Sequence, residues 1–168
     1  IDEAHPLQPS DPYALSKQLG EEVARSFVHH GMQSVALRPV FIAHEASRIE
    51  IEARARDPRG YSPGQAGGAQ PAAGGAVWHH VDTRDVARAF RLALELEMNG
   101  PGFEPFFISA NVTLSPEPTL ERLETWLDAP LPPIRQPAQW QDNPHAPLYD
   151  LTRAKNVLGF DAEYDARA

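Results

Sequence analysis

The first third of the chain carries a helical pattern of apolar residues. Four large apolar residues follow one another at four-residue steps: Leu15, Leu19, Val23 and Phe27. This spacing predicts an amphipathic helix from Tyr13 to about His30. Pro12 suits the first position of this helix, because its missing N–H would have no partner there. Gly31 is expected to end it.

A short apolar run after this helix predicts a buried strand. Val35–Leu37 is apolar throughout, and Pro39 is expected to end the strand. A helix, a glycine turn and a buried strand make up half of a βαβ unit, so the sequence predicts a parallel sheet. The predicted fold class is therefore α/β.

The rest of the chain predicts further elements of both kinds. Four more helices are expected at 46–56, 83–98, 116–127 and 152–158, and two more strands at 77–81 and 106–110. Asp82 is expected to cap the helix that follows it, with Asp85 in the place of a capping-box glutamate. The proline-rich residues 130–147 are predicted to form a connection without regular structure.

Residues 57–76 have an unusual composition, with six glycines and three prolines. Such a stretch cannot bury enough apolar surface to offset its chain entropy, and we expect a flexible loop. Loops of this length are either functional or disordered. A lid over a binding site and a disordered surface insertion are the two alternatives, and the composition favours the insertion.

The composition of the 168 residues is that of a soluble globular protein, with 42% apolar and 23% charged residues. Fifteen Lys and Arg against 23 Asp and Glu give a net charge of −8, which argues against a nucleic-acid partner. The chain has no cysteine, so disulfides and thiolate metal sites are excluded and a cytoplasmic location is expected. No apolar stretch approaches the length of a membrane span, and no membrane partner is expected.

The strongest candidate chemistry lies at the start of the first helix. Tyr13 and Lys17 are four residues apart, so they share one face of that helix, about 6 Å apart along its axis. The ammonium group favours the charged form of the neighbouring phenol, which makes Tyr13 a candidate proton donor and acceptor. Alone, this spacing is also common on helices that have no function.

Four segments around this pair resemble the extended short-chain dehydrogenase/reductases, the family of NAD(P)-dependent epimerases and dehydratases. In chain order they resemble the approach to the catalytic Tyr and Lys, the sixth strand with its Arg-Pro turn, the "HVDDVA" segment and the C-terminal helix of that family. These segments are Glu3–Lys17, Val35–Ile42, Trp78–Ala89 and Tyr149–Phe160. Together they extend over nearly the whole chain in the order of the family.

The resemblance implies a fold and a division into domains. Residues 1–45 would form the C-terminal edge of a Rossmann-type NAD(P)-binding domain, including the Tyr/Lys helix. Residues 46–168 would belong mostly to a small substrate-binding domain, with the strand near 106–110 returning to the Rossmann sheet. The phosphate-binding glycine motif of the family would lie upstream of Tyr13, so the chain is expected to be the C-terminal half of an enzyme.

The resemblance also implies roles for individual residues. Tyr13 would be the general acid and base and would also contact the cofactor, and Lys17 would assist it and hold the nicotinamide ribose. Three residues of the Arg-Pro turn would contact the nicotinamide: Pro39, Val40 and Ile42. Substrate contacts are expected from Phe41, His44 and Arg84. Phe41 is followed by His44-Glu45, where the family typically has Asn and then Gly-Pro, so a contact made by that Asn is not carried over.

The implied function is the epimerisation or dehydration of a nucleotide-sugar-like substrate with NAD or NADP, in an intact parent that forms a homodimer. Two alternatives stay open: a reductase or dehydrogenase of the same family, and a non-catalytic remnant that acts only as a folded or partner-binding domain. No metal site is expected. The pairs His29-His30 and His79-His80 are adjacent residues, whose side chains diverge and cannot chelate one ion well.

Overall fold

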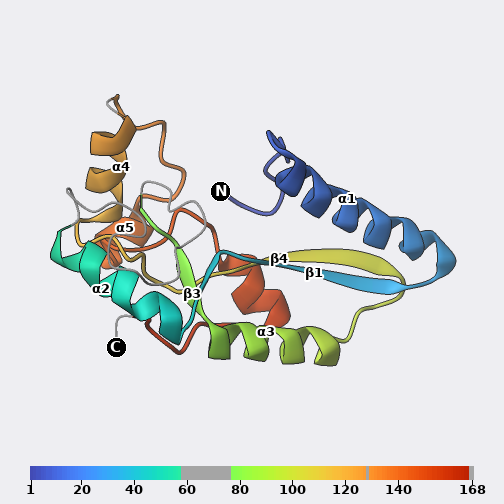
Figure 1. Ribbon diagram of the computed structural model, residues 1–168. Coiled ribbons are helices and arrows are strands. Elements are labelled where there is room, and N and C mark those ends of the chain that lie inside the picture. The colour runs from blue at the N-terminus through green and yellow to red at the C-terminus, as the bar shows by residue number, and fades with distance from the viewer. Residues whose placement is uncertain (58–76, 128, 167–168) are drawn as a thin grey trace.

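A computed structural model describes residues 1–57, 77–127 and 129–166 (Figure 1). The main elements of the described residues are α1 (Pro12–Ser26), β1 (Gln33–Pro39), β2 (Phe41–Ala43), α2 (Arg48–Arg56), β3 (His80–Asp82), α3 (Thr83–Glu95), β4 (Gly102–Ile108), α4 (Thr119–Leu127) and α5 (Ala138–Asp142). Three short helical turns are η1 (Phe27–His30), η2 (Glu45–Ser47) and η3 (Ala154–Leu158). The loop predicted at 57–76 falls, apart from Asp57, outside the described residues.

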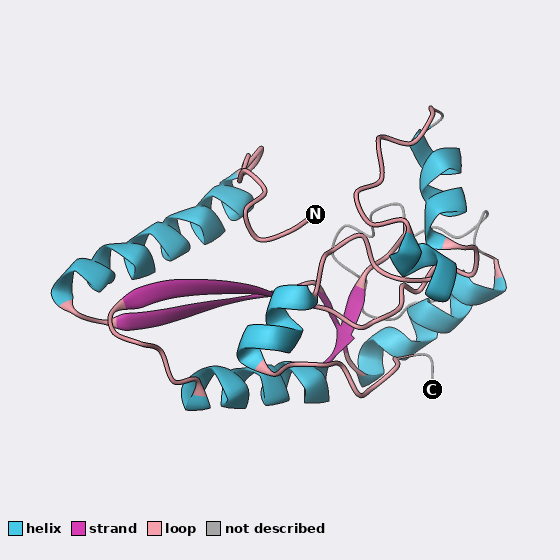
Figure 2. Ribbon diagram, turned by 180° about the vertical axis from the view of Figure 1, so that it is seen from behind, coloured by secondary structure: helices cyan, strands magenta, loops and turns pink. Residues whose placement is uncertain are grey.

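Two small parallel sheets form the centre of the molecule. β1 pairs with β4, in a register that runs from Gln33 opposite Gly102 to Pro39 opposite Ile108. β2 pairs with β3, with Ile42 opposite Val81. α1 lies on one side of the β1–β4 ribbon and α3 on the other, while α2, α4 and α5 gather at the end where β2 and β3 lie (Figures 1 and 2). The predicted parallel sheet is therefore present.

The main hydrophobic core lies on the side of the sheet that α3 and η3 cover. Its buried residues come from β3, α3, β4, η3 and the chain that follows: Val81, Ala89, Phe106, Ile108, Ala154, Leu158 and Phe160. A second cluster lies between β2, α2 and the chain around Trp78, and consists of Ala43, Ile51, Trp78 and Leu114. The first of these cores positions α3 and the carboxyl end of β4.

α1 takes no part in either core. It has no buried residue. Its apolar stripe, Leu15, Leu19 and Val23, is continued by Phe27 of η1, and these four residues are between 46% and 57% exposed. The helix itself forms as predicted. The Asp11 carboxylate accepts a hydrogen bond of 2.8 Å from the Ala14 amide at its start, and Gly31, at φ 85°, ends the η1 turn that continues it.

Several boundaries differ from those that the sequence predicts. β4 begins at Gly102 and not at 106, because it pairs with the whole of β1. α3 ends at Glu95, three residues early. The short helix α5 lies inside the stretch 130–147, so the prediction of a connection without regular structure is wrong there. Trp140 of this helix donates an indole hydrogen bond of 3.2 Å to the Ala146 carbonyl, a tertiary contact that residue propensities do not indicate.

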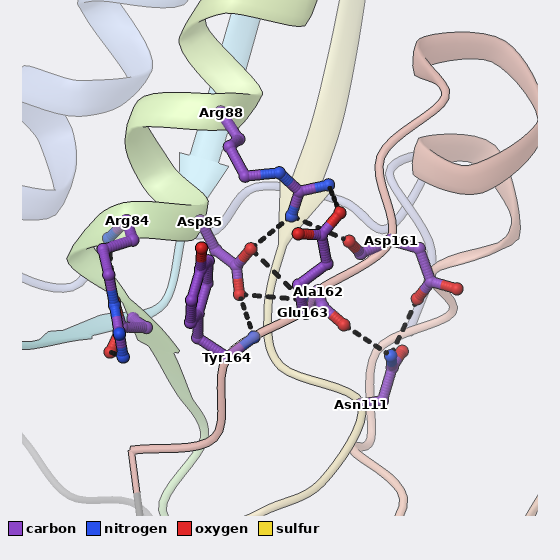
Figure 3. A network of polar contacts seen from close by, with 9 residues as sticks. Arg84, Asp85, Arg88, Asn111, Asp161, Ala162, Glu163 and Tyr164 are labelled. Carbon is purple, nitrogen blue, oxygen red and sulfur yellow. Dashed lines mark hydrogen bonds and ion pairs between the residues drawn. The ribbon is translucent and has the colours of Figure 1, made fainter.

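Asp85 has a different role from the capping-box position expected for it. Asp82 does cap α3, accepting a hydrogen bond of 2.8 Å from the Arg84 amide. Asp85 instead is fully buried and accepts hydrogen bonds from the backbone amides of Glu163 and Tyr164, at 3.1 and 2.9 Å (Figure 3). Arg88 donates to the same carboxylate at 2.5 Å. Asp85 therefore links the C-terminal segment, at Glu163 and Tyr164, to the first turn of α3.

His79 connects the entry to β3 with residues near the end of the chain. Its Nε2 atom accepts a hydrogen bond of 3.0 Å from the Leu148 amide, and its ring lies 4.6 Å from that of Tyr149. Burial, reinforced by the neighbouring His80, lowers the pKa of His79 from 6.5 to about 4. The folded chain therefore favours the neutral form of the His79 ring.

This pKa shift predicts a loss of stability in mild acid. The unfolded chain binds a proton at His79 below about pH 6.5, and the folded chain does so only below about pH 4. The stabilisation is thus present at neutral pH and is lost as the pH falls through this window, by about 2 kcal/mol between pH 7 and pH 5. Urea unfolding at several pH values measures it.

The control for this measurement is a pair of histidine variants. His79→Gln keeps a hydrogen-bond acceptor for the Leu148 amide and cannot titrate, so the free energy of unfolding should change less with pH. His30→Gln removes a histidine that is exposed at the end of η1, and should keep the wild-type dependence. Equal pH dependence in wild type and His79→Gln would contradict the account.

Candidate functional site

Tyr13 is held at the start of α1 with its ring open to solvent. The Asp11 cap and Pro12 at the first helical position put Tyr13 in the first turn. Its side chain is 72% exposed, so its hydroxyl is accessible to a ligand. Lys17 lies one turn later, with its Nζ atom 5.0 Å from the centre of the Tyr13 ring. The structure therefore brings the predicted catalytic pair together.

A groove of about 1240 Å³ opens beside this pair. Its walls are α1, β1 and the last turns of α3, and it includes Tyr13, Lys17, Pro39 and Ile42. Phe90 and Leu94 of α3 add an apolar wall and are 56% and 88% exposed. Four of the five residues predicted to catalyse the reaction or contact the cofactor thus share one groove.

The fifth, Val40, lies elsewhere. Its side chain packs against the main core, and its amide donates a hydrogen bond of 3.1 Å to the Ile108 carbonyl. Val40 is not among the residues that line the groove. Its position suits a structural role in joining β1 to β4 at the end of the strand pair.

The three predicted substrate-binding residues are divided between two places. Phe41 stacks on Trp78, with ring centres 6.2 Å apart, and packs against the second core. His44 and Arg84 line a smaller cavity of about 300 Å³ at the carboxyl ends of β2 and β3. The carboxyl end of parallel strands is the usual location of ligand sites in α/β folds.

Arg84 already has partners within the chain. It makes two hydrogen bonds to the Asp82 carboxylate, at 2.8 and 2.9 Å, and its guanidinium lies 3.9 Å from the centre of the Tyr164 ring (Figure 3). The hydrogen bond to Arg84 lowers the pKa of Asp82. Asp82 therefore neutralises the charge that a substrate phosphate would need from Arg84.

Two features near the site are difficult to predict from the sequence: the ion pair between Glu21 and Arg38 and the backbone conformation of Trp78. Glu21 and Arg38 form a two-pronged ion pair between α1 and β1, with both hydrogen bonds at 2.7 Å, and this hydrogen bond raises the pKa of Arg38. Glu21 follows Lys17 by four residues, which is the signal that could have indicated its place on the same face. Trp78 is buried with φ at 50°, and nothing in its local sequence indicates this strained conformation.

Residues 1–57, 77–127 and 129–166 contain no group of three or more His, Asp or Glu side chains that could hold a metal ion. Within the same residues, no helix combines the length and the apolar character that a bilayer crossing requires.

Two solved structures share this fold. One is MoeE5 in complex with UDP-glucuronic acid and NAD, with a TM-score of 0.57. The other is the UDP-N-acetylglucosamine 4-epimerase from Bacillus cereus, with a TM-score of 0.58. Each is 16% identical to this chain, and each likeness covers 99% of this chain and 55% of the other. The chain matches no family model and no curated protein sequence.

These comparisons establish the fold. The chain spans about half the length of the structures that it resembles. Its parallel α/β arrangement corresponds to the C-terminal part of the epimerase fold. The predicted fold class is thereby confirmed, and the resemblance drawn from the four sequence segments is confirmed at the level of the fold.

Proposed function

We propose that this chain is the catalytic, C-terminal part of an NAD-dependent enzyme that acts on a nucleotide sugar. The observation that carries the proposal is the groove in which Tyr13, Lys17, Pro39 and Ile42 meet. This groove lies in a fold shared with a protein that binds UDP-glucuronic acid and NAD and with a UDP-sugar 4-epimerase.

Tyr13 is the proposed general acid and base. Its exposed phenol takes the proton of a substrate hydroxyl as the C–O bond becomes a carbonyl, and returns a proton when the carbonyl is reduced. Lys17 is close enough to stabilise the phenolate electrostatically. NAD, when bound, supplies the other half of the chemistry by taking the hydride from the same substrate carbon.

The residues of the groove suit the nicotinamide end of this cofactor. Pro39 and Ile42 offer an apolar surface beside the Tyr13–Lys17 pair, and Lys17 can donate hydrogen bonds to ribose hydroxyls. Among the described residues, β1 pairs only with β4. The groove continues from the Tyr13–Lys17 pair along the other edge of β1, where the proposed dinucleotide-binding part would add its strands, so the nicotinamide is assigned only to the end of the groove beside Tyr13 and Pro39.

The β4 edge of this small sheet is protected from pairing with a further strand, which supports the addition of strands at β1. Pro105 lies in the middle of β4 and has no amide hydrogen to donate. The Phe107 amide donates a hydrogen bond of 3.0 Å to the Glu3 carboxylate and not to another strand. Proline and charged side chains are common devices that protect an edge strand from further pairing.

The sugar nucleotide is proposed to extend from Tyr13 toward the smaller cavity lined by His44 and Arg84. Because Asp82 neutralises Arg84, this cavity is assigned to the sugar and not to a phosphate.

We also propose that the intact protein is a homodimer. The exposed stripe of α1, with Leu19 at 54% and Val23 at 57% exposure, is the kind of apolar surface that marks an interface. Two-fold dimers are the commonest oligomers.

The experiment that tests the function uses the intact protein that carries this chain. With NAD present, it is incubated with UDP-glucuronic acid or UDP-N-acetylglucosamine, and the products are followed by NMR. We expect conversion of a nucleotide sugar that depends on NAD. Accumulation of reduced cofactor would indicate a dehydrogenase, and its absence an epimerase or a dehydratase, which the NMR spectrum of the product distinguishes. A folded protein that binds NAD but converts no nucleotide sugar would contradict the proposal and favour a non-catalytic role.

A further inference from the structure

The ion pair between Glu21 and Arg38 is the best-formed polar link between α1 and the sheet. The Arg38 Nε and one terminal nitrogen each donate a hydrogen bond of 2.7 Å to the two Glu21 oxygens. The two side chains are only 15% and 17% exposed. Arg38 also donates to the Glu3 carbonyl at 3.1 Å. We call this arrangement the Glu21–Arg38 bridge.

α1 has little else to fix it at the end that carries Tyr13. None of its residues is fully buried, and the half-buried ones, Ala14, Gln18, Glu21 and Ala24, are small or polar, so apolar packing constrains its rotation about its own axis only weakly. Its other polar links to the sheet come from its last turns. Arg25 lies 4.0 Å from the centre of the Phe103 ring, and the Ser34 hydroxyl donates to the Ala24 carbonyl at 3.4 Å.

The bridge lies on the same side of α1 as the proposed catalytic pair. Tyr13, Lys17 and Glu21 follow one another at four-residue steps, and all three line the groove. Arg38 comes directly before Pro39, which also lines it. A planar guanidinium held by both carboxylate oxygens allows little rotation between its two partners.

We propose that Glu21 and Arg38 are positioning residues, which hold α1 in the rotation that directs Tyr13 and Lys17 into the groove beside Pro39 and Ile42. The consequence of this inference for catalysis rests on the proposed function. The orientation of α1, which is its structural part, does not depend on that function. Displacements of about 1 Å from mutations remote from the reacting atoms can lower turnover about 10²-fold, so such a bridge affects rate without touching the substrate.

The first test measures the orientation of α1 in the full 168-residue chain. The chain has no cysteine, so spin labels can be attached at two introduced cysteines, Ser16→Cys on α1 and Glu95→Cys on α3, both at exposed positions. We expect one narrow distance distribution in the parent and a broad or shifted one in Glu21→Gln. Arg38→Lys keeps the charge but loses the planar fork, and should broaden it as well.

The matched control is Glu22→Gln. Glu22 is the neighbouring acidic residue, exposed and 3.9 Å from Arg25 of the same helix, so its loss should leave the distribution unchanged. Circular dichroism confirms that each variant keeps its helices. An unchanged distribution in folded Glu21→Gln or Arg38→Lys would overturn the proposal, whatever the activity of the protein.

The second test measures kinetics in the intact protein. We expect Glu21→Gln and Arg38→Lys to lower kcat about 10- to 100-fold while KM for NAD changes less than about 2-fold. The double variant Glu21→Gln/Arg38→Lys should lose no more than the worse single variant, because both remove the same link. Additive losses, or a rise in KM at constant kcat, would overturn the positioning role. If the intact wild-type protein were inactive while these variants still broadened the distance distribution of α1, the result would contradict only the proposed function.

Discussion

Tyr13→Phe is expected to lower kcat of the intact protein about 10²-fold or more. The substitution keeps the ring and removes only the hydroxyl that exchanges a proton with the substrate. Because the ring is 72% exposed, no core contact is lost and the fold should be unaffected. KM for the nucleotide sugar and binding of NAD should change little, since a proton-transfer group acts mainly in the transition state.

Tyr149→Phe is the matched control for this experiment. Tyr149 contacts the Phe107 and His79 rings, each with 4.6 Å between ring centres, and it does not line the groove. Its hydroxyl should be dispensable, so turnover should stay within about 2-fold of wild type. Wild-type turnover in Tyr13→Phe would show that the Tyr13–Lys17 pair has no catalytic role.

Asp85→Ala is expected to destabilise the chain by about 3 kcal/mol. The fully buried carboxylate accepts hydrogen bonds from two backbone amides, those of Glu163 and Tyr164, and pairs with Arg88. Removing it leaves both amides without their acceptor and takes one of the acceptors of the Arg88 guanidinium, and such losses are among the most costly single substitutions. The free energy of unfolding in urea measures the effect.

The control for Asp85 comes from the same network. Glu163 pairs with Arg88 through a side chain that is 59% exposed (Figure 3), and exposed pairs contribute between 0 and about 1 kcal/mol. Glu163→Gln should therefore cost far less than Asp85→Ala. If the two variants were equally stable, the carboxylate of Asp85 would not be the anchor of the C-terminal segment.

Local chemistry explains which elements can be predicted from the sequence. Asp11 and Pro12 mark the start of α1, and the two glycines that end helical segments, Gly31 and Gly159, both adopt positive φ, at 85° and 73°. Each signal acts within a few residues. The Tyr13–Lys17 pair is of the same kind, because its geometry depends only on one helical turn.

Contacts between segments that are distant in the sequence explain where the structure differs from the sequence-based predictions. Asp85 contacts Glu163 and Tyr164, 78 and 79 residues away, and no local pattern indicates that partnership. The Glu21–Arg38 bridge joins residues 17 apart on two different elements. Sequence periodicity identifies the faces of α1 and β1 but does not indicate which charged residues meet across them.

The most direct test of the central claim follows reduced nicotinamide during a single turnover of the intact protein. NAD-loaded wild type is mixed with the nucleotide sugar that it converts, and the absorbance of the reduced cofactor is recorded over time beside that of Tyr13→Phe. The account predicts a rapid and transient rise in wild type, since the hydride is returned within the turnover, and a rise slowed about 10²-fold in the variant. Equal rates in the two proteins would contradict the assignment of Tyr13 as the group that accepts the substrate proton.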